Sequence, residues 1–247
     1  MKTTSPLLTL LIVLFFSCSS DNDNGGENPD TGNPGNPGNQ TCDDPSSFIF
    51  NEKDNFILVE FENNEFPAEW ELKTSNSATG KGYHVWAGNQ SLGTPGNGLV
   101  EFKLNINNPG IYRFLWSSAV TTGTNGSDHN DSWLKFPDAD DFYGEKDGSK
   151  IYPKGTGKTP NPNGSSADGW FKVYRSGNDL DFKWQAATSD NDAHKIYVEF
   201  KNAGVYKMQV SARSSGHGID KFMLFNEANY SQNEATQKTT FSEITCN

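Results

Sequence analysis

The feature that most restricts how this 247-residue chain can fold is the alternation of apolar and polar residues in several short segments. In residues 100–106, Val, Phe, Leu and Ile occupy every second position, with Glu, Lys and Asn between them. A period of two places the apolar side chains on one face of a β-strand. Residues 196–200 and 206–210 alternate in the same way. We therefore expect strands that bury one face.

Further strands are expected where short apolar and aromatic runs lie between turn residues, at 56–61, 111–116, 133–136, 170–174, 180–184 and 221–225. Asn108-Pro109-Gly110 and Asn202-Ala203-Gly204 predict turns between consecutive strands. No segment keeps a helical period over three turns. The pattern predicts an all-β fold in which two sheets pack as a β-sandwich.

Residues 137–169 differ from the rest, because Pro, Gly, Asn, Asp and Ser dominate them. A loop of this length inside a domain is usually functional or disordered. It contains Tyr143 and Tyr152, so we expect it to pack partly on the domain.

The composition restricts the partners. Acidic residues outnumber basic ones by 31 to 20, which gives a net charge of −11. Nucleic-acid binding is disfavoured, because a phosphate backbone requires clustered Lys and Arg. Polyanionic polysaccharides are disfavoured less strongly, since a local basic patch can exist on an acidic protein. Aromatic residues make up 13% of the chain, which suits an extracellular all-β domain.

The first residues have the features of an export signal. Lys2 precedes an apolar run from Leu7 to Phe16, which is short for a membrane span, so we expect residues 1–17 to be a signal peptide. The run ends in Ser17-Cys18, which resembles the lipobox of bacterial lipoproteins. That resemblance implies cleavage before Cys18 and attachment of lipid to it. An ordinary signal peptide with an incidental cysteine is the alternative.

Residues 18–45 are expected to be a flexible linker behind the lipid anchor. Asp21 and Asp23 follow the cysteine in a short acidic tract, which resembles the surface-export signal of Bacteroidetes lipoproteins. This implies a surface-exposed lipoprotein of the outer membrane. Residues 28–39 are Asn, Pro, Gly, Asp and Thr, with no apolar side chain to bury, so they predict a solvated tether. The folded domain is expected at 46–247.

Cys42 and Cys246 lie at the two ends of the folded region. In an exported protein such a pair predicts a disulfide, and closing a loop of this size stabilises by roughly 4–5 kcal/mol in the chain-entropy model. Two free thiols are the alternative. A metal site is disfavoured, because no Cys-x-x-Cys or His cluster accompanies them.

The order of six short motifs resembles that of family 6 carbohydrate-binding modules and related galactose-binding-like β-sandwiches. The motifs are Val59-Glu60-Phe61-Glu62, Gly82-Tyr83-His84-Val85-Trp86, Pro109-Gly110-Ile111-Tyr112, Gly169-Trp170-Phe171, Gly204-Val205-Tyr206 and Ile219-Asp220-Lys221-Phe222. The resemblance covers about residues 56–225 and implies a jelly-roll sandwich that binds sugar.

The resemblance also implies a binding site. Tyr83 and Trp170 would flank a sugar ring, with Trp86 as a substitute for Tyr83. The family often has an Asn just before the last strand, but here residues 215–220 contain none. Arg213 or His217 would then hydrogen-bond the sugar hydroxyls.

A structural calcium ion is implied as well. The family's acidic ligands match Glu60, Glu62 and Asp220, and hard carboxylate oxygens suit calcium. In the alternative, Glu60 and Glu62 point to solvent.

Two polar clusters, Asp128-His129-Asn130-Asp131 and Asp190-Asn191-Asp192-Ala193-His194, precede strands. We expect them to be solvated turns, although they could bind hydroxyls, hold a metal or supply acid–base groups. No sequence motif isolates the carboxylate pair that glycoside hydrolysis needs.

The leading hypothesis is therefore a non-catalytic lipoprotein that captures polysaccharide, preferably a neutral glycan such as a β-glucan, for an uptake complex or neighbouring glycosidases. One alternative is a β-sandwich glycoside hydrolase or polysaccharide lyase that uses His129, His194 or His217 with nearby acids. A protein-binding adhesin or scaffold is another.

Overall fold

The structure is a computed structural model that describes residues 42–246. The predictions for the signal peptide, for Cys18 and for the linker up to residue 41 lie outside the described residues. The described part is almost entirely β-structure, which confirms the predicted all-β class. Two long strands that form its centre, β6 and β16, are antiparallel neighbours.

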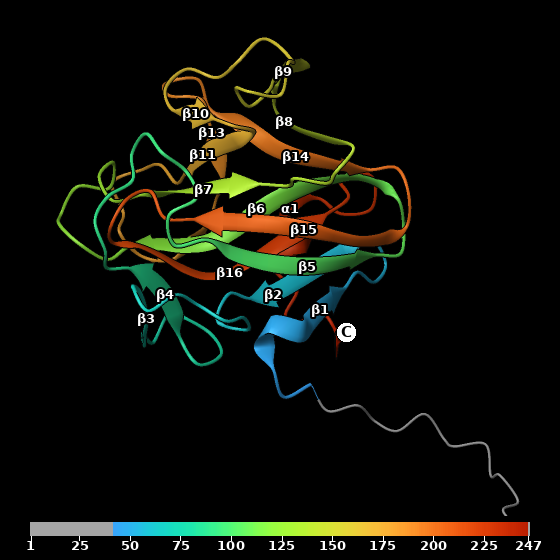
Figure 1. The fold of residues 1–247 in the computed structure, drawn as a ribbon, viewed down its shortest axis with the longest axis horizontal. Helices are drawn as coiled ribbons and strands as arrows, with labels where there is room; N and C mark the ends of the chain where they lie inside the picture. The colour runs from blue at the N-terminus through green and yellow to red at the C-terminus, as the bar shows by residue number, and fades with distance from the viewer. Residues whose placement is uncertain (1–41, 247) are drawn as a thin grey trace, which may run out of the picture. The chain divides into compact units, whose positions relative to one another are not determined.

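The strands form two layers (Figure 1). In the front layer the hydrogen-bonded order is β17, β1, β5, β15, β7, β11 and β10. In the back layer β16 lies between β6 on one side and β4 and β2 on the other, and β14, β8 and β9 continue beyond β6. The short strand β13 pairs with β11 and with β14, so it joins the two layers at one edge. All these pairings are antiparallel except that of β1 with β5.

The front-layer strands are β17 (Ile244–Cys246), β1 (Phe48–Asn51), β5 (Val100–Ile106), β15 (Gly204–Ser211), β7 (Asp131–Lys135), β11 (Trp170–Tyr174) and β10 (Ser166–Ala167). The back-layer and bridging strands are β2 (Phe56–Glu60), β3 (Trp70–Lys73), β4 (Tyr83–Trp86), β6 (Gly110–Val120), β8 (Asp141–Lys146), β9 (Ser149–Ile151), β12 (Lys183–Trp184), β13 (Ala187–Thr188), β14 (His194–Phe200) and β16 (His217–Phe225). A 3-10 turn (η1, Pro45–Ser47) and one helix (α1, Gln232–Thr236) complete the described elements.

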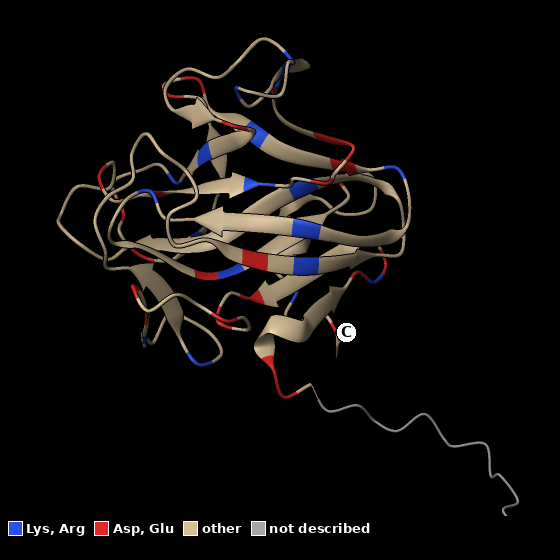
Figure 2. Cartoon of the chain, viewed as in Figure 1, with Lys and Arg blue, Asp and Glu red and all other residues tan. Residues whose placement is uncertain are grey.

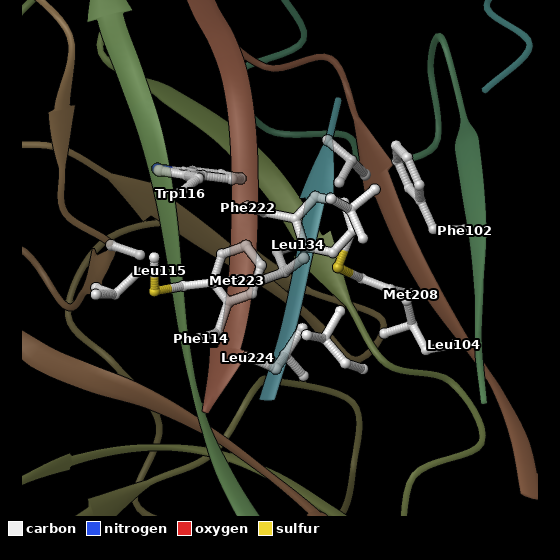
Figure 3. Packing of buried hydrophobic residues seen from close by; sticks show 14 of the residues in the cluster. Phe102, Leu104, Phe114, Leu115, Trp116, Leu134, Met208, Phe222, Met223 and Leu224 are labelled. Carbon is white, nitrogen blue, oxygen red and sulfur yellow. The ribbon is translucent and has the colours of Figure 1, made fainter. Parts of the chain in front are cut away.

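Charged side chains are spread over the loops and strands of both layers, and neither sign dominates the face seen in Figure 2. The inner faces of the layers are apolar. From the front layer, Phe102, Leu104 and Met208 point inward, and Phe114 and Phe222 face them from the back layer (Figure 3). The rings of Phe102 and Phe222 meet edge to face at 5.0 Å between centroids. Contacts of this kind across the gap define a β-sandwich core.

A C-terminal segment, residues 226–243, packs on the outer side of the back layer. Ala235 of α1 is fully buried in the core cluster, and the Tyr230 ring packs edge-on against Phe56. Ser242 pairs with Leu58, because its backbone N–H donates to the Leu58 carbonyl and its hydroxyl accepts from the Leu58 N–H. These contacts hold the segment against β2.

The disulfide prediction is confirmed. Cys42 and Cys246 are bonded, with 5.6 Å between their Cα atoms. The bond lies beside the antiparallel pair of β1 and β17, so the two ends of the folded region are held by both hydrogen bonds and a covalent link.

The long loop expected at 137–169 is only partly a loop. It contains β8, which pairs with β14 along five residues, and β9, which pairs with β8. Tyr143 of β8 is buried and stacks on Tyr197 of β14. The expectation that this segment packs on the domain therefore holds, but its first part is a strand of the back layer.

Candidate functional site

The structure places Tyr83 and Trp86 at opposite faces of the short strand β4, and both side chains are buried. Tyr83 packs against the β16 backbone, since a Cβ added at Gly218 would lie 2.9 Å from its ring. Trp86 packs edge-on against Trp70 and donates its indole N–H to the Asn89 carbonyl. These two rings fill space between elements and do not form one open platform.

Trp170, which was predicted to flank a sugar ring, is buried in the structure. Its side chain is only 6% exposed. The segment that precedes β11 is held beside this strand, because Ser166 donates its hydroxyl to the Trp170 carbonyl and Lys135 donates to the Asp168 carbonyl. The Lys135 ammonium lies 5.8 Å from the centre of the indole ring. Trp170 therefore has little surface left for a sugar ring.

Arg213 is also buried, in a polar cluster on the outer face of the front layer. Its guanidinium donates to the Asp131 carboxylate and lies 5.3 Å from the Trp133 ring centre. Ser214 also donates its hydroxyl to Asp131. The first polar cluster of the sequence is therefore not a solvated turn throughout, because Asn130 and Asp131 are buried in this arrangement.

His217 is fully enclosed, with 0% of the residue exposed. Its Nδ1 lies 2.9 Å from the Ser132 hydroxyl, and its ring meets Trp116 edge-on. Burial, helped by the nearby positive charge of Arg175, lowers the pKa of His217 to about 3. The imidazole is neutral at physiological pH and sits in the core, away from any surface ligand.

The other histidines are placed differently. His129 is partly exposed, and its Nδ1 lies 2.6 Å from the Ser215 carbonyl. His194 is buried, with its Nδ1 2.6 Å from the Asp192 carbonyl, so the second polar cluster is also not solvated throughout. In both histidines the hydrogen-bond partner of Nδ1 is a backbone carbonyl and not a carboxylate.

The three acidic residues of the predicted calcium site do come together. Glu60, Glu62 and Asp220 are buried around the loop at 79–81, which contradicts the alternative in which the glutamates point to solvent. Thr79 donates to Glu60 and Asp220, and the Lys81 N–H donates to Glu62. These carboxylates lie together because the β2–β16 pairing sets Glu60 opposite Lys221, the residue that follows Asp220.

The acidic cluster carries unbalanced negative charge. Burial, aided by the charges of Glu62 and Asp220 and opposed by the Thr79 hydrogen bond, raises the pKa of Glu60 to about 7. Glu62 Oε2 and Asp220 Oδ2 are buried without a hydrogen-bond partner, although the Lys221 ammonium lies 3.2 Å from the latter. Hard oxygens in this state suit calcium chemically. Within residues 42–246, however, no three acidic, His or Cys side chains are arranged to hold a metal as they stand, and calcium stays a prediction.

A large cavity of the described residues lies elsewhere, between β1, the end of β5 and the C-terminal segment. We call it the C-terminal cleft. Its volume is about 820 Å³, within the range of small-ligand sites. Its lining is mainly polar, with three aromatic rings, and consists of Asn51, Glu52, Lys53, Asp54, Phe56, Asn105, Asn107, Tyr230, Gln237, Lys238, Thr239, Thr240, Phe241, Ser242, Glu243 and Thr245.

One wall of the C-terminal cleft is a row of side-chain amides held in fixed orientations. Asn107 donates to the Glu52 carbonyl, Asn105 donates to the side chains of Asn51 and Asn107, and Asn51 donates to the Thr245 hydroxyl. The β1–β5 pairing places Asn51 directly beside Asn105, so the strand register sets the spacing of the row. Such a wall presents several directional hydrogen-bonding groups at once.

The C-terminal segment lines another part of the cleft, and it carries the only large exposed ring among the described residues, Phe241, at 39% exposure. The other two rings of the cleft are occupied: Phe56 packs on Tyr230, and the Lys238 ammonium lies 4.5 Å from the centre of the Tyr230 ring. Phe241 is therefore the aromatic ring of the C-terminal cleft that is most open to a ligand.

Charges in the C-terminal cleft nearly balance. The carboxylate of Glu52 is buried and accepts hydrogen bonds from the backbone of Asn55, Asn107 and Asn108, so it organises the wall from within. The remaining charged lining residues are Lys53, Asp54, Lys238 and Glu243, two of each sign. The cleft has no strong preference for an anion or a cation.

Sequence patterns did not point to this cleft. Asn51 and Asn105 occupy polar positions of alternating strands, where a solvent-facing residue is expected, and Phe241 follows the last predicted strand. The signal that could have been used is the clustering of Thr and Phe at 239–241 just before Cys246.

Comparison with known proteins finds limited likeness. No family model matches the chain. Over 137 residues it is 26% identical to the uncharacterized protein P23 of Formosa agariphila, an alignment that covers 53% of this chain and 26% of that protein. The chain thus spans about a quarter of the length of that relative.

Among solved structures, a Podospora anserina GH26-CBM35 β-(1,4)-mannanase overlaps 73% of this chain and 29% of its own, with a TM-score of 0.42 and 14% identity. Within residues 42–246, no helix is long and apolar enough to cross a membrane.

Proposed function

We propose that this protein binds glycan, and that the C-terminal cleft is where it does so. The observation that carries the proposal is that one exposed aromatic ring, Phe241, and the fixed amide row of Asn51, Asn105 and Asn107 line the same cleft. A sugar ring has an apolar C–H face, which packs on an aromatic ring, and hydroxyls, which need directional polar partners. The cleft supplies both kinds of contact.

A neutral glycan, such as a β-glucan, suits the balanced charges of the cleft. A strongly anionic chain would meet Asp54 and Glu243 there as well as a net charge of −11 on the protein. Both effects disfavour a polyanion at this place.

We propose further that binding is non-catalytic. Hydrolysis of a glycosidic bond needs one acid and one base or nucleophile within reach of the sugar. The buried acid of the cleft, Glu52, is fully used in holding backbone N–H groups, which supports a structural role for it. Release of reducing ends from a polysaccharide by the purified protein would contradict this part of the proposal.

The lipobox, the acidic tract and the tether support a place on the cell surface for the domain. We propose a lipid anchor at Cys18 in the outer membrane, and polysaccharide uptake machinery or neighbouring glycosidases as the recipients of the captured glycan. A Cys18→Ser variant is then expected to lose incorporation of labelled palmitate and to leave the membrane fraction. Retention of label in that variant would contradict the anchor.

For the acidic cluster we propose a structural calcium ion held by Glu60, Glu62 and Asp220. Calcium binding would neutralise the carboxylates and raise the melting temperature above that measured with chelator, because a ligand that binds only the folded state stabilises it. Glu60→Gln should abolish this calcium-dependent shift, whereas Glu71→Gln, an exposed strand substitution, should keep it. An identical melting temperature with calcium and with chelator would refute the ion.

The proposed function is tested by affinity electrophoresis of residues 42–247 in gels that contain neutral β-glucan, mannan or xylan, with turnover monitored on the same samples. At least one neutral glycan should retard the protein without product release. Retardation by none of them would contradict the proposal, and product release would favour the enzyme alternative.

A further inference from the structure

A second cavity, of about 410 Å³, lies on the back layer, where β6, β12, β13 and β14 meet. We call it the basic pocket. Its lining combines apolar, amide and basic side chains and consists of Arg113, Leu115, Ser176, Lys183, Trp184, Gln185, Ala186, Ala187, Ala193, His194, Lys195 and Gln232. Gln232 belongs to α1, so the C-terminal segment contributes to both this pocket and the C-terminal cleft.

The charge of the basic pocket is opposite to that of the protein. Arg113, Lys183 and Lys195 line it, together with His194, and no acidic residue is part of the lining. The whole chain carries 31 acidic residues and a net charge of −11. All the charged residues that line this pocket are basic, although acidic residues outnumber basic ones in the chain.

Part of this positive charge is neutralised by carboxylates behind the lining. Arg113 donates to Glu227 and to Gln232 at 2.7 Å each, and its side chain is mostly buried. Lys183 pairs with Asp179 at 2.6 Å. Lys195 is the least compensated, because Glu227 lies 4.0 Å away and the Lys195 side chain is 55% exposed. Its ammonium is the group most available to a ligand.

The basic pocket also offers an aromatic surface. Trp184 is partly buried against the core and partly open, and Leu115, Ala186 and Ala187 supply apolar surface beside it. Gln185 exchanges two hydrogen bonds with Ser176, which fixes the amide at the rim. An aromatic ring, a fixed amide and an exposed ammonium together match the three parts of an acidic sugar: its C–H face, its hydroxyls and its anionic group.

We propose that the basic pocket binds an anionic sugar unit, with the sugar ring against Trp184 and its carboxylate or sulfate at Lys195. The inference goes beyond the proposed function, which concerns neutral glycan in a different cleft. Because the surrounding protein is acidic, the attraction acts over a short range, and the ligand is a single acidic unit rather than a densely charged chain.

The test is isothermal titration of residues 42–247 at low ionic strength with galacturonate, with galactose 6-sulfate and with neutral galactose. At least one anionic probe should bind, and which one binds separates carboxylate from sulfate recognition. Affinity should fall in Lys195→Gln by about tenfold, the scale of one charge-assisted hydrogen bond. Lys195→Glu should remove measurable binding.

Lys73→Gln is the matched control, because Lys73 is similarly exposed on β3 and also lies near a carboxylate. It should keep the affinity of the unmodified protein. Binding should also weaken in about 1 M salt, where the screening length falls to about 3 Å. Failure of both anionic probes to bind, or an equal loss in Lys73→Gln and Lys195→Gln, would overturn the inference.

Neutral-glycan binding in the C-terminal cleft and anionic-sugar binding in the basic pocket can be disproved independently of each other. Phe241→Ala lies in the C-terminal cleft and should leave the affinity for the anionic probe unchanged. If Phe241→Ala and Lys195→Gln reduced anionic binding equally, the basic pocket would not be the site.

Discussion

Glu60 shows how one buried side chain couples folding to pH. Its pKa is raised from 4.5 to about 7, chiefly by burial. Between pH 4.5 and about pH 7, Glu60 keeps a proton in the folded protein that it has already released in the unfolded chain. The contribution of Glu60 is therefore complete below pH 4.5 and is lost as the pH rises through about 7.

We therefore expect the unfolding free energy, measured by urea denaturation in the presence of chelator, to fall between pH 5 and pH 7.5 in the unmodified protein. Glu60→Gln has no proton to lose and should flatten this fall. Burial also raises the pKa of Glu62, so part of the pH dependence of the unfolding free energy should persist in Glu60→Gln. An unchanged pH slope in Glu60→Gln would show that the raised pKa is not the cause.

Asp131 is expected to be among the most sensitive residues of the front layer. It is buried and holds the Arg213 guanidinium and the Ser214 hydroxyl. Asp131→Asn leaves the Arg213 charge buried without its partner, which costs about 3–5 kcal/mol in comparable pairs. Urea denaturation measures the loss. Glu71→Gln, which breaks the exposed pair with Lys73, should change stability little, and an equal effect of the two substitutions would contradict this account.

At the residue scale, the sequence predicted side-chain chemistry better than side-chain exposure. Trp116 ends the strand predicted at 111–116 and is fully buried. Trp170 follows Asp168-Gly169 in the chain, a context that suggests an open loop, yet it is buried, with the Lys135 ammonium near its ring. Whether Tyr83, Trp86, Trp170, Arg213 or His217 contacts sugar stays a prediction, and all five are buried as the structure stands.

At the scale of elements, the C-terminal segment has the most consequences, because it forms a wall of the C-terminal cleft. It is held by the pairing of Ser242 with Leu58 and by the disulfide that ends β17. Removing the disulfide frees the end of this wall as well as enlarging the unfolded ensemble.

Cys246→Ser combined with Cys42→Ser should therefore lower the unfolding free energy by about 2–5 kcal/mol. It should also weaken binding of neutral glycan, while binding of the anionic probe to the basic pocket changes less. Denaturation and calorimetry on the double variant measure both effects. Reduction of the unmodified protein should reproduce them. Stability equal to that of the oxidised protein would contradict the role of the bond.

Strands with one buried face were predictable from the sequence, since burial of one face requires alternation. The segment predicted at 170–174 coincides with β11, and that at 100–106 with β5. β8 was missed because Tyr143 and Phe142 are both buried, so its sequence does not alternate. The strand predicted at 180–184 is limited to the two residues of β12, and the two-residue strands β10 and β13 have no sequence signature. The short helix α1 was missed although Ser231 and Glu234 form a capping box.

At the scale of the whole molecule, the two-layer architecture separates the sites. The predicted aromatic residues lie in and between the layers, whereas both cavities discussed above are partly lined by the C-terminal segment on the back layer. Sequence alone could not place that segment, because its contacts join residues about as far apart in the chain as Asn51 and Thr245. The net charge of −11 predicted which partners to exclude but not that a basic pocket exists.

The central claim is that Phe241 and the amide row bind neutral glycan, and calorimetric titration tests it most directly. The unmodified protein is titrated with the neutral glycan that retards it most, and Phe241→Ala and Leu72→Ala are titrated in parallel. Both substituted residues are exposed apolar side chains, at 39% and 47%. We expect Phe241→Ala to weaken binding about tenfold, the value of one aromatic stacking contact, and Leu72→Ala to leave it unchanged. Equal affinity of Phe241→Ala and the unmodified protein would contradict the claim.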